Sequence, residues 1–220
     1  MKEALIVWGG WEGHQPKQCA QVVTDLLKAE GLNVQVEDSA SAFADPDLGR
    51  FDLIVPIVTQ ETISPEACKN LVATVTKGTG LAGFHGGMGD SFRAEPDYQF
   101  MAGGQWVAHP GNIISYRVMI TKPDDPITRG VEDFDYQSEQ YYMHVDPGLK
   151  VLADTKFPTP GADGPHVPNG DIRMPVLWTK MYGKGRVFYS SIGHSAAVVE
   201  SEPHLTIMRR GFAWATKQPK

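Results

Sequence analysis

The chain has 220 residues, 41% of them hydrophobic and 21% charged, which is enough to bury a substantial core and is typical of a globular protein. Its formal net charge is −6 and the sequence contains no basic cluster, so a nucleic-acid partner is not expected. The first apolar run is too short for a secretory signal, and no stretch of about 18 apolar residues predicts a membrane span.

The two cysteines, Cys19 and Cys68, lie among helix-forming residues. Buried free thiols are therefore expected, rather than a disulfide or a reactive pair. Since neither a signal nor a membrane span is expected, the sequence predicts a soluble protein of a reducing compartment, most simply the cytoplasm.

The first 85 residues alternate between strand and helix signals. Wholly apolar runs such as "DLIVPIV" are typical of strands that are covered on both faces. Strands are expected over 4–8, 33–37, 52–58 and 80–84, with helices over 16–30 and 64–78 between them. This order predicts a parallel sheet with helices on both faces.

The second half of the sequence is less regular. The expected elements are a helix over 97–102, a strand over 112–120, a long surface loop rich in Pro and Gly over 156–173, two strands within 174–194 and a final helix over 202–216. The two strands meet around "YGKG", which is a hairpin signal. No repeat, charge block or linker divides the chain, so residues 1–220 are expected to form a single domain.

Histidines gather near the ends of the expected strands. Of the seven in the chain, four closely follow a strand, and a fifth comes just after "GGQWVA": His14, His85, His144, His194 and His109. Ligands of open α/β sheets bind beyond the carboxyl ends of the strands, so these histidines are candidate site residues. Taken singly, each is more often a structural or surface histidine.

His85 holds the most informative of these positions. It is the centre of "GFHGG", which has the spacing of a nucleophile elbow, a strained strand-to-helix turn that exposes its central side chain above the sheet edge. Because this residue is a histidine, the elbow holds no Ser or Cys nucleophile. Its imidazole could be a general base, an acid or a metal ligand; a tight turn with an incidental ring is the alternative.

Glu139 lies in a strand-to-loop setting, five residues before His144. Its carboxylate can orient an imidazole or share an acid–base task, although an exposed edge glutamate is an equally good interpretation. Aromatic residues near these positions suit stacking against a sugar ring, while core packing is their usual role: Trp8, Trp11, Trp106, Tyr141 and Tyr142. No G-x-G-x-x-G or G-K-[ST] motif occurs, so a nucleotide cofactor is not expected.

Several segments together resemble, in order, those of the trehalose-utilisation ThuA-like family: "GLAGFHGGMGDSF", "GGQWVAHP", "SEQYYMHVDPGLKVLAD" and "YGKGRVFYSSIGH". The resemblance covers nearly the whole chain and implies an α/β fold of the class I glutamine amidotransferase-like superfamily, a flavodoxin-like three-layer sandwich with a mainly parallel central sheet. In those relatives the elbow holds a catalytic cysteine and a histidine follows a late strand. Here these positions hold His85 and His194, so amidotransferase activity is not implied.

The resemblance further implies a sugar-processing protein of disaccharide (trehalose-type) catabolism, in which related proteins occur beside sugar dehydrogenases that make 3-keto sugars. It suggests a carbohydrate hydrolase, lyase or isomerase that acts on a keto sugar or a glycoside by acid–base chemistry. The expected catalytic residues are His85, Glu139 and His194. Substrate contacts are expected from five further side chains: His14, His109, His144, Trp11 and Tyr141.

Two alternatives remain open. A divalent metal such as Zn²⁺ could be held by His14, His109 and His144, although no H-E-x-x-H spacing marks a ligand set. The protein could also be a non-catalytic carbohydrate-binding or regulatory domain on a degenerate amidotransferase-like scaffold. In either case the expected partner is a small carbohydrate, and Trp178 or Trp214 could serve a homo-oligomer interface as readily as a core.

Overall fold

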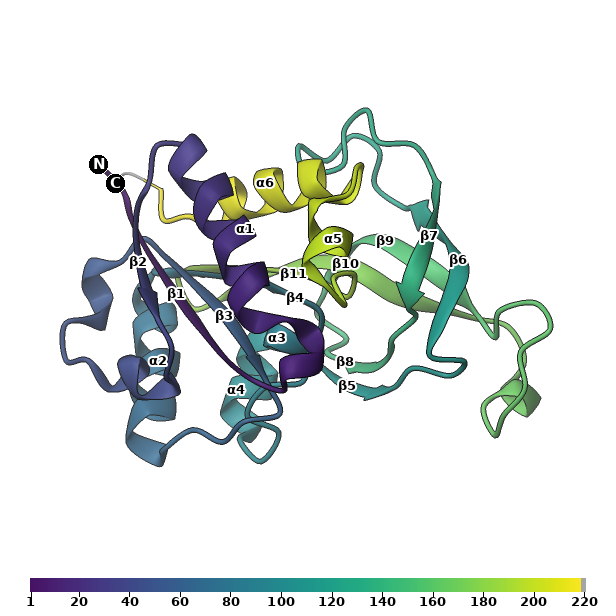
Figure 1. Ribbon diagram of the computed structural model, residues 1–220, viewed down its shortest axis with the longest axis horizontal. Coiled ribbons are helices and arrows are strands. Elements are labelled where there is room, and N and C mark those ends of the chain that lie inside the picture. Colours follow the sequence, from purple (N-terminus) through teal and green to yellow (C-terminus); the bar gives the residue numbers. More distant parts are fainter. Residues whose placement is uncertain (219–220) are drawn as a thin grey trace.

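A nine-stranded sheet forms the centre of the molecule, with its strands in the order β2-β1-β3-β4-β11-β10-β9-β6-β7 (Figure 1). The structure, a computed structural model, describes residues 1–218. Neighbouring strands are parallel from β2 to β11 and antiparallel from β11 to β7. Strands β5 and β8 pair separately, as a small antiparallel sheet.

The bounds of the elements follow the chain order. The large sheet holds β1 (Glu3–Gly10), β2 (Asn33–Glu37), β3 (Leu53–Thr59), β4 (Gly80–Phe84), β6 (Ile113–Ile120), β7 (Phe134–Glu139), β9 (Lys150–Phe157), β10 (Ile172–Tyr182) and β11 (Gly185–Ser190). The small sheet holds β5 (Gly104–Ala108) and β8 (Tyr142–Val145). The helices are α1 (Pro16–Ala29), α2 (Pro65–Lys77), α3 (His85–Gly89), α4 (Pro96–Ala102), α5 (Ala196–Glu200) and α6 (His204–Ala215).

Both faces of the parallel strands are covered by helices. Figure 1 shows α1, α5 and α6 on one side of the sheet and α2 and α4 on the other. In β1, Ala4 and Ile6 belong to the core beneath α1 and α6, whereas Leu5 and Val7 belong to the core beneath α2 and α4. This two-sided burial explains why these strands read as continuous apolar runs, and it confirms the expected flavodoxin-like α/β fold.

The ends of α2 show how local sequence fixes an element. The Ser64 hydroxyl accepts a hydrogen bond from the backbone N–H of Ala67 at 3.2 Å, and Pro65 occupies the first turn. Gly78, with φ of 127°, ends the helix in a conformation that residues with a side chain rarely adopt. The helix therefore begins and ends where the serine, proline and glycine predict.

The second half departs from the expected elements in part. The β10–β11 hairpin is confirmed, but β5, β7 and β9 have no counterpart among the expected strands. The expectation that His144 closely follows a strand is wrong, because β7 ends at Glu139 and His144 lies within β8. Trp178 is 1% exposed and its indole N–H donates to the Ala102 carbonyl at 3.1 Å, so it packs in the core and is not available for an interface.

The carboxyl ends of β1, β4 and β11 lie at one edge of the sheet, because these strands are parallel. Strand β7 has the same direction, since four successive antiparallel pairings separate it from β11. In a flat sheet, four spacings of about 4.8 Å would keep β7 roughly 19 Å from β11. Glu139 at the end of β7 nevertheless lies 3.0 Å from His85, which follows β4. The antiparallel part of the sheet therefore curls back over this edge.

Cys19 and Cys68 are buried and free, as expected. Within residues 1–218, no helix combines the length and the apolar character that crossing a bilayer requires.

The substitution Gly211→Ala tests the packing of α6 on β11. A Cβ atom at this position would lie 2.4 Å from the ring of Phe188, which is fully buried. We expect the free energy of unfolding to fall by about 1–3 kcal/mol, although alanine is the better helix former. Urea denaturation measures this difference. The control is Gly49→Ala, since a Cβ there meets nothing within 4 Å; a Gly211→Ala protein at least as stable as wild type would contradict the close packing.

A candidate histidine–glutamate site

The turn between β4 and α3 positions His85. This residue has φ of 45°, in the left-handed region that few non-glycine residues adopt, so the turn is strained as the elbow spacing predicts. A Cβ atom on Gly86 would lie 2.6 Å from Cε1 of His14, and one on Gly87 would lie 2.9 Å from Cα of Ile57. The two glycines therefore allow the elbow to pack directly against His14 and β3.

The His85 ring lies at the bottom of the site. It is 1% exposed, so the expectation that the elbow exposes this side chain is wrong. Its Nδ1 donates to the Ser191 carbonyl at 2.8 Å, and its Nε2 lies 3.0 Å from Oε2 of Glu139. Tyr141 stacks on one face of the ring, with the centroids 4.0 Å apart. The ring is therefore held at both nitrogens and on one face, and it does not line the cavity beside the site.

His14 follows β1 in a short turn. Its Nδ1 lies 3.1 Å from the hydroxyl of Thr59, the last residue of β3, and its Nε2 lies 3.6 Å from Oε2 of Glu139. Gln15 ends this turn in the left-handed conformation, and its side-chain oxygen accepts from the backbone N–H of Ala196 at 3.2 Å. Gln15 therefore connects the turn that carries His14 to the loop that carries the next histidine of the site.

His194 lies in the loop after β11. Its Nδ1 is 3.3 Å from Oε1 of Glu139. This nitrogen is buried, and in the part of the chain that the structure describes it has no aligned hydrogen-bond partner. The loop approaches β4 closely, because a Cβ atom on Gly193 would lie 2.6 Å from the ring of Phe84.

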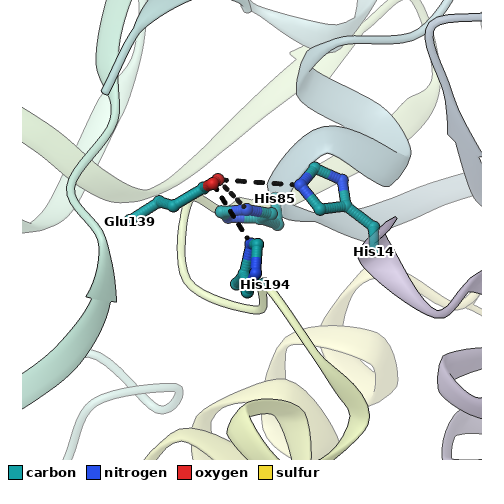
Figure 2. Close-up of side chains that lie close together, drawn as sticks. All are labelled: His14, His85, Glu139 and His194. Carbon is teal, nitrogen blue, oxygen red and sulfur yellow. Dashed lines mark hydrogen bonds and ion pairs between the residues drawn. The ribbon is translucent and has the colours of Figure 1, made fainter. Parts of the chain in front are cut away.

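One carboxylate joins the three rings. Glu139 is 5% exposed, and Figure 2 shows it contacting His14, His85 and His194 from the opposite side of the site. The ring centroids of these histidines lie 4.7 to 5.8 Å apart. The four side chains offer ligand atoms that all lie within 4.8 Å of one another, a spacing that suits a shared metal ion. We refer to them as the histidine–glutamate centre.

Burial and contacts between the side chains shift the pKa values of this centre in opposite directions. Burial lowers the pKa of His85 to about 4, although its hydrogen bond to Glu139 acts in the opposite direction. Burial acts to raise the pKa of the Glu139 carboxyl, but its contacts with His14, His194 and His85 outweigh this and hold that pKa well below its usual range. The carboxylate is therefore charged at neutral pH, and the ring beneath it is neutral.

The remaining expected histidines have different positions. His109 lies at the rim, with Nε2 3.8 Å from Oε1 of Glu139. His144 is exposed within β8; because side chains alternate along a strand, the burial of its neighbour Met143 turns it away. Of the expected metal set of His14, His109 and His144, only His14 belongs to the group of ligand atoms in the centre.

A cavity of about 240 Å³ opens beside the centre. Five of the expected site residues line it: Trp11, His14, His109, Glu139 and Tyr141. Two polar residues of the same wall, Gln60 and Asp90, were not among the expected site residues. Gln60 directly follows β3, so the same strand-end signal that singled out the histidines could have found it. Asp90 forms an ion pair with Arg93, whose guanidinium also donates to the Trp106 carbonyl at 3.0 Å.

A larger cavity of about 680 Å³ meets the first at two shared residues, Trp106 and His109. Apolar and aromatic side chains make up most of its wall: Trp106, Val107, Ala108, Pro110, Tyr142 and Pro165. The stretch around 163–166 belongs to the expected surface loop, so that loop closes one side of the cavity. The sequence pattern does not indicate this role, because it depends on the loop folding against β5 and β8.

The fold and the site together define a class of protein: a flavodoxin-like α/β protein with a buried histidine–glutamate centre at the carboxyl edge of its parallel strands. The model of the ThuA family, described as trehalose utilisation, matches residues 3–215, so the chain belongs to this family. No curated protein sequence matches the chain.

Solved structures share this fold. A ThuA-like protein from Parabacteroides merdae ATCC 43184 is 18% identical, with a TM-score of 0.75 over 100% of this chain and 92% of that one. A ThuA-like protein from Bacteroides uniformis ATCC 8492 is also 18% identical, with a TM-score of 0.76 over 97% and 91% of the two chains. A cytoplasmic protein from Salmonella typhimurium LT2 is 15% identical, with a TM-score of 0.68 over 98% and 100%. At these identities the likeness concerns the fold alone.

His204 is a buried histidine outside the site, and it makes the stability dependent on pH. Its Nε2 lies 2.9 Å from the Ser190 hydroxyl, and burial lowers its pKa to about 3. In the unfolded chain the pKa returns to about 6.5, so the unfolded state takes up the proton first as the pH falls. The stabilising contribution is complete above about pH 6.5 and is lost progressively toward pH 3.

We expect the variant His204→Gln to show a shallower fall of unfolding free energy between pH 6.5 and 4.5 than wild type. The slope should decrease by about 1.4 kcal/mol per pH unit, because one proton fewer is taken up on unfolding. Urea denaturation at several pH values in this range measures the slope. An unchanged slope would contradict a neutral, buried His204.

Proposed function

We propose that this protein catalyses a step on an oxidised disaccharide, such as a 3-keto sugar, or on a related glycoside, by acid–base chemistry. The observation that carries the proposal is the convergence of the histidine–glutamate centre beside a cavity lined by polar and aromatic side chains. Membership of a family described as trehalose utilisation supports a carbohydrate as the substrate class.

His109 is the proton carrier in this proposal. Its side chain is 29% exposed, it lines both cavities, and its Nε2 lies 3.8 Å from the Glu139 carboxylate. A keto group makes the adjacent C–H acidic, so a neutral imidazole can remove that proton and deliver it to another atom of the sugar. The developing enolate oxygen carries negative charge, which polar donors near the centre would stabilise. His85, His194 and Glu139 then hold the geometry beneath the reacting ring.

The larger cavity supports a substrate with two rings. Aromatic faces pack well against the apolar faces of sugar rings, and Trp106 stands where the two cavities meet. Arg93 holds this indole in place, with its guanidinium carbon 5.4 Å from the ring centroid and a hydrogen bond to the Trp106 carbonyl. The reacting ring would occupy the smaller cavity and the second ring the larger one.

A non-catalytic carbohydrate-binding domain is the alternative function, and the histidine at the elbow favours it because the nucleophile of the amidotransferase-like relatives is missing.

Neither cysteine of the chain suits the nucleophile that glutaminase activity would need. Burial raises the pKa of Cys19 to about 12 and that of Cys68 to about 11, so neither provides a thiolate at neutral pH.

The cytoplasm is the location that we propose. Both cysteines are free and buried, which suits a reducing compartment. The Salmonella typhimurium protein with the same fold is described as cytoplasmic, which supports the same location here.

The proposal is tested by incubating the protein with 3-keto disaccharides and with the matching unoxidised disaccharides, and by following products by mass spectrometry. We expect conversion of a 3-keto disaccharide, and we expect His109→Ala to lower kcat/KM about 100-fold, because general acid–base catalysis is lost. The control is His144→Ala, which changes an exposed histidine outside the centre and should leave turnover unchanged. Binding of these sugars without any conversion would favour the carbohydrate-binding alternative.

The variant Trp106→Ala tests the two-ring arrangement. It removes the aromatic wall shared by both cavities, so we expect KM for a disaccharide to rise about tenfold while kcat changes little. Steady-state kinetics with a keto monosaccharide and a keto disaccharide measure the difference. The control is Phe100→Ala, since this ring is 61% exposed and lines neither cavity. An equal effect on both substrates would contradict binding of the second ring at Trp106.

A further inference from the structure

The histidine–glutamate centre has the composition and spacing of a metal site. Its members come from four separate parts of the fold, and Figure 2 shows the three imidazoles gathered around the Glu139 carboxylate. The carboxylate oxygens of Glu139 lie 3.0 to 3.6 Å from the nearest nitrogens of His14, His85 and His194. In a tetrahedral zinc site with bonds of about 2.0–2.1 Å, ligand atoms are separated by roughly 3.4 Å.

The contact between His85 and Glu139 requires a cation, which is either a proton or a metal ion. A backbone carbonyl can only accept, so the ring hydrogen of neutral His85 lies on Nδ1, which donates to Ser191. If the ring is neutral, the lone pair of its Nε2 faces the carboxylate at 3.0 Å. Two acceptors at this distance repel each other unless a cation lies between them.

A single proton between these groups does not satisfy the rest of the centre. His194 also directs a buried nitrogen at the carboxylate, without an aligned partner among the described residues. A buried polar atom that lacks a partner is costly, and a proton shared by His85 and Glu139 would leave Nδ1 of His194 without one. A divalent ion accepts lone pairs from every ring and from the carboxylate at once.

The far sides of two rings are held as metal-binding histidines usually are. Nδ1 of His85 donates to the Ser191 carbonyl at 2.8 Å, and Nδ1 of His14 lies 3.1 Å from the Thr59 hydroxyl. Such outer contacts fix the tautomer and leave Nε2 free to coordinate. Gly86 adds a steric constraint, because any side chain there would displace the His14 ring.

We propose that His14, His85, Glu139 and His194 bind one divalent first-row transition-metal ion, for example Zn²⁺. Imidazole ligands favour ions of this class over Mg²⁺ or Ca²⁺, which prefer oxygen ligands. The ion lies beside the smaller cavity, where it can take a sugar oxygen as a further ligand and polarise it. His109 stays outside the ligand set and keeps an imidazole at the rim.

Metal binding is measured on the full chain without any sugar. The protein is stripped with a chelator, dialysed and titrated with Zn²⁺ by calorimetry, and with Co²⁺ by visible absorption. We expect one tightly bound ion per chain, a rise in melting temperature on binding, and no saturable binding of Mg²⁺ at the same concentrations. Absence of stoichiometric Zn²⁺ and Co²⁺ binding would overturn the proposal.

Four variants locate the ion. Glu139→Gln and His194→Asn each remove a ligand, and the second changes a loop residue, so it keeps the test informative if the first does not fold. Thr59→Val keeps the shape of a buried side chain but removes the contact to His14, and should weaken binding about 10–100-fold. His144→Ala should bind as wild type does. Wild-type affinity in both ligand variants would overturn the assignment of the ligands.

The binding result does not depend on the proposed reaction. A protein that binds Zn²⁺ as described but converts no sugar would contradict the proposed function and support the metal site. A protein that converts a 3-keto disaccharide at full rate after chelation, and binds no Zn²⁺ or Co²⁺, would support the proposed function and contradict the metal site.

Discussion

The contact of one carboxylate with three imidazoles constrains the rest of this structure. Glu139 ends β7, while His14, His85 and His194 follow β1, β4 and β11 at the carboxyl edge of the parallel strands. The sheet must curl for these groups to meet, because a flat arrangement would keep β7 roughly 19 Å away from β11. The strained elbow and its glycines serve the same contact, since they allow the His85 and His14 rings to approach each other.

The sequence predicts the parallel half of the fold because each signal there is local. Apolar runs mark β1, β3 and β4, caps and glycines mark the ends of α2, and "GFHGG" marks the turn at His85. The antiparallel half depends on pairings between distant segments, which local patterns do not encode. This is why the break between β7 and β8 was missed, and with it the outward position of His144.

The sequence also predicts only part of the candidate site. Polar residues at strand ends are visible in the sequence, and His14, His85 and His194 belong to this group. What the sequence does not indicate is their depth: His85 reads as exposed but is covered by Tyr141 and Glu139, because the following strands fold over it. The outer contacts of Thr59 and Ser191 are also hidden, since a single hydroxyl or carbonyl at a strand end has no distinctive pattern.

The molecule therefore combines a buried histidine–glutamate centre, an imidazole at its rim and an aromatic cavity beyond it. Our main proposal is that the four side chains of the histidine–glutamate centre bind one divalent cation. Anomalous scattering from crystals of the Zn²⁺-loaded protein, recorded on both sides of the zinc absorption edge, tests this directly. We expect a single strong peak at about 2.0–2.2 Å from a nitrogen of each histidine and from the Glu139 carboxylate. A peak at His144 or elsewhere on the surface, with nothing between these four side chains, would contradict it.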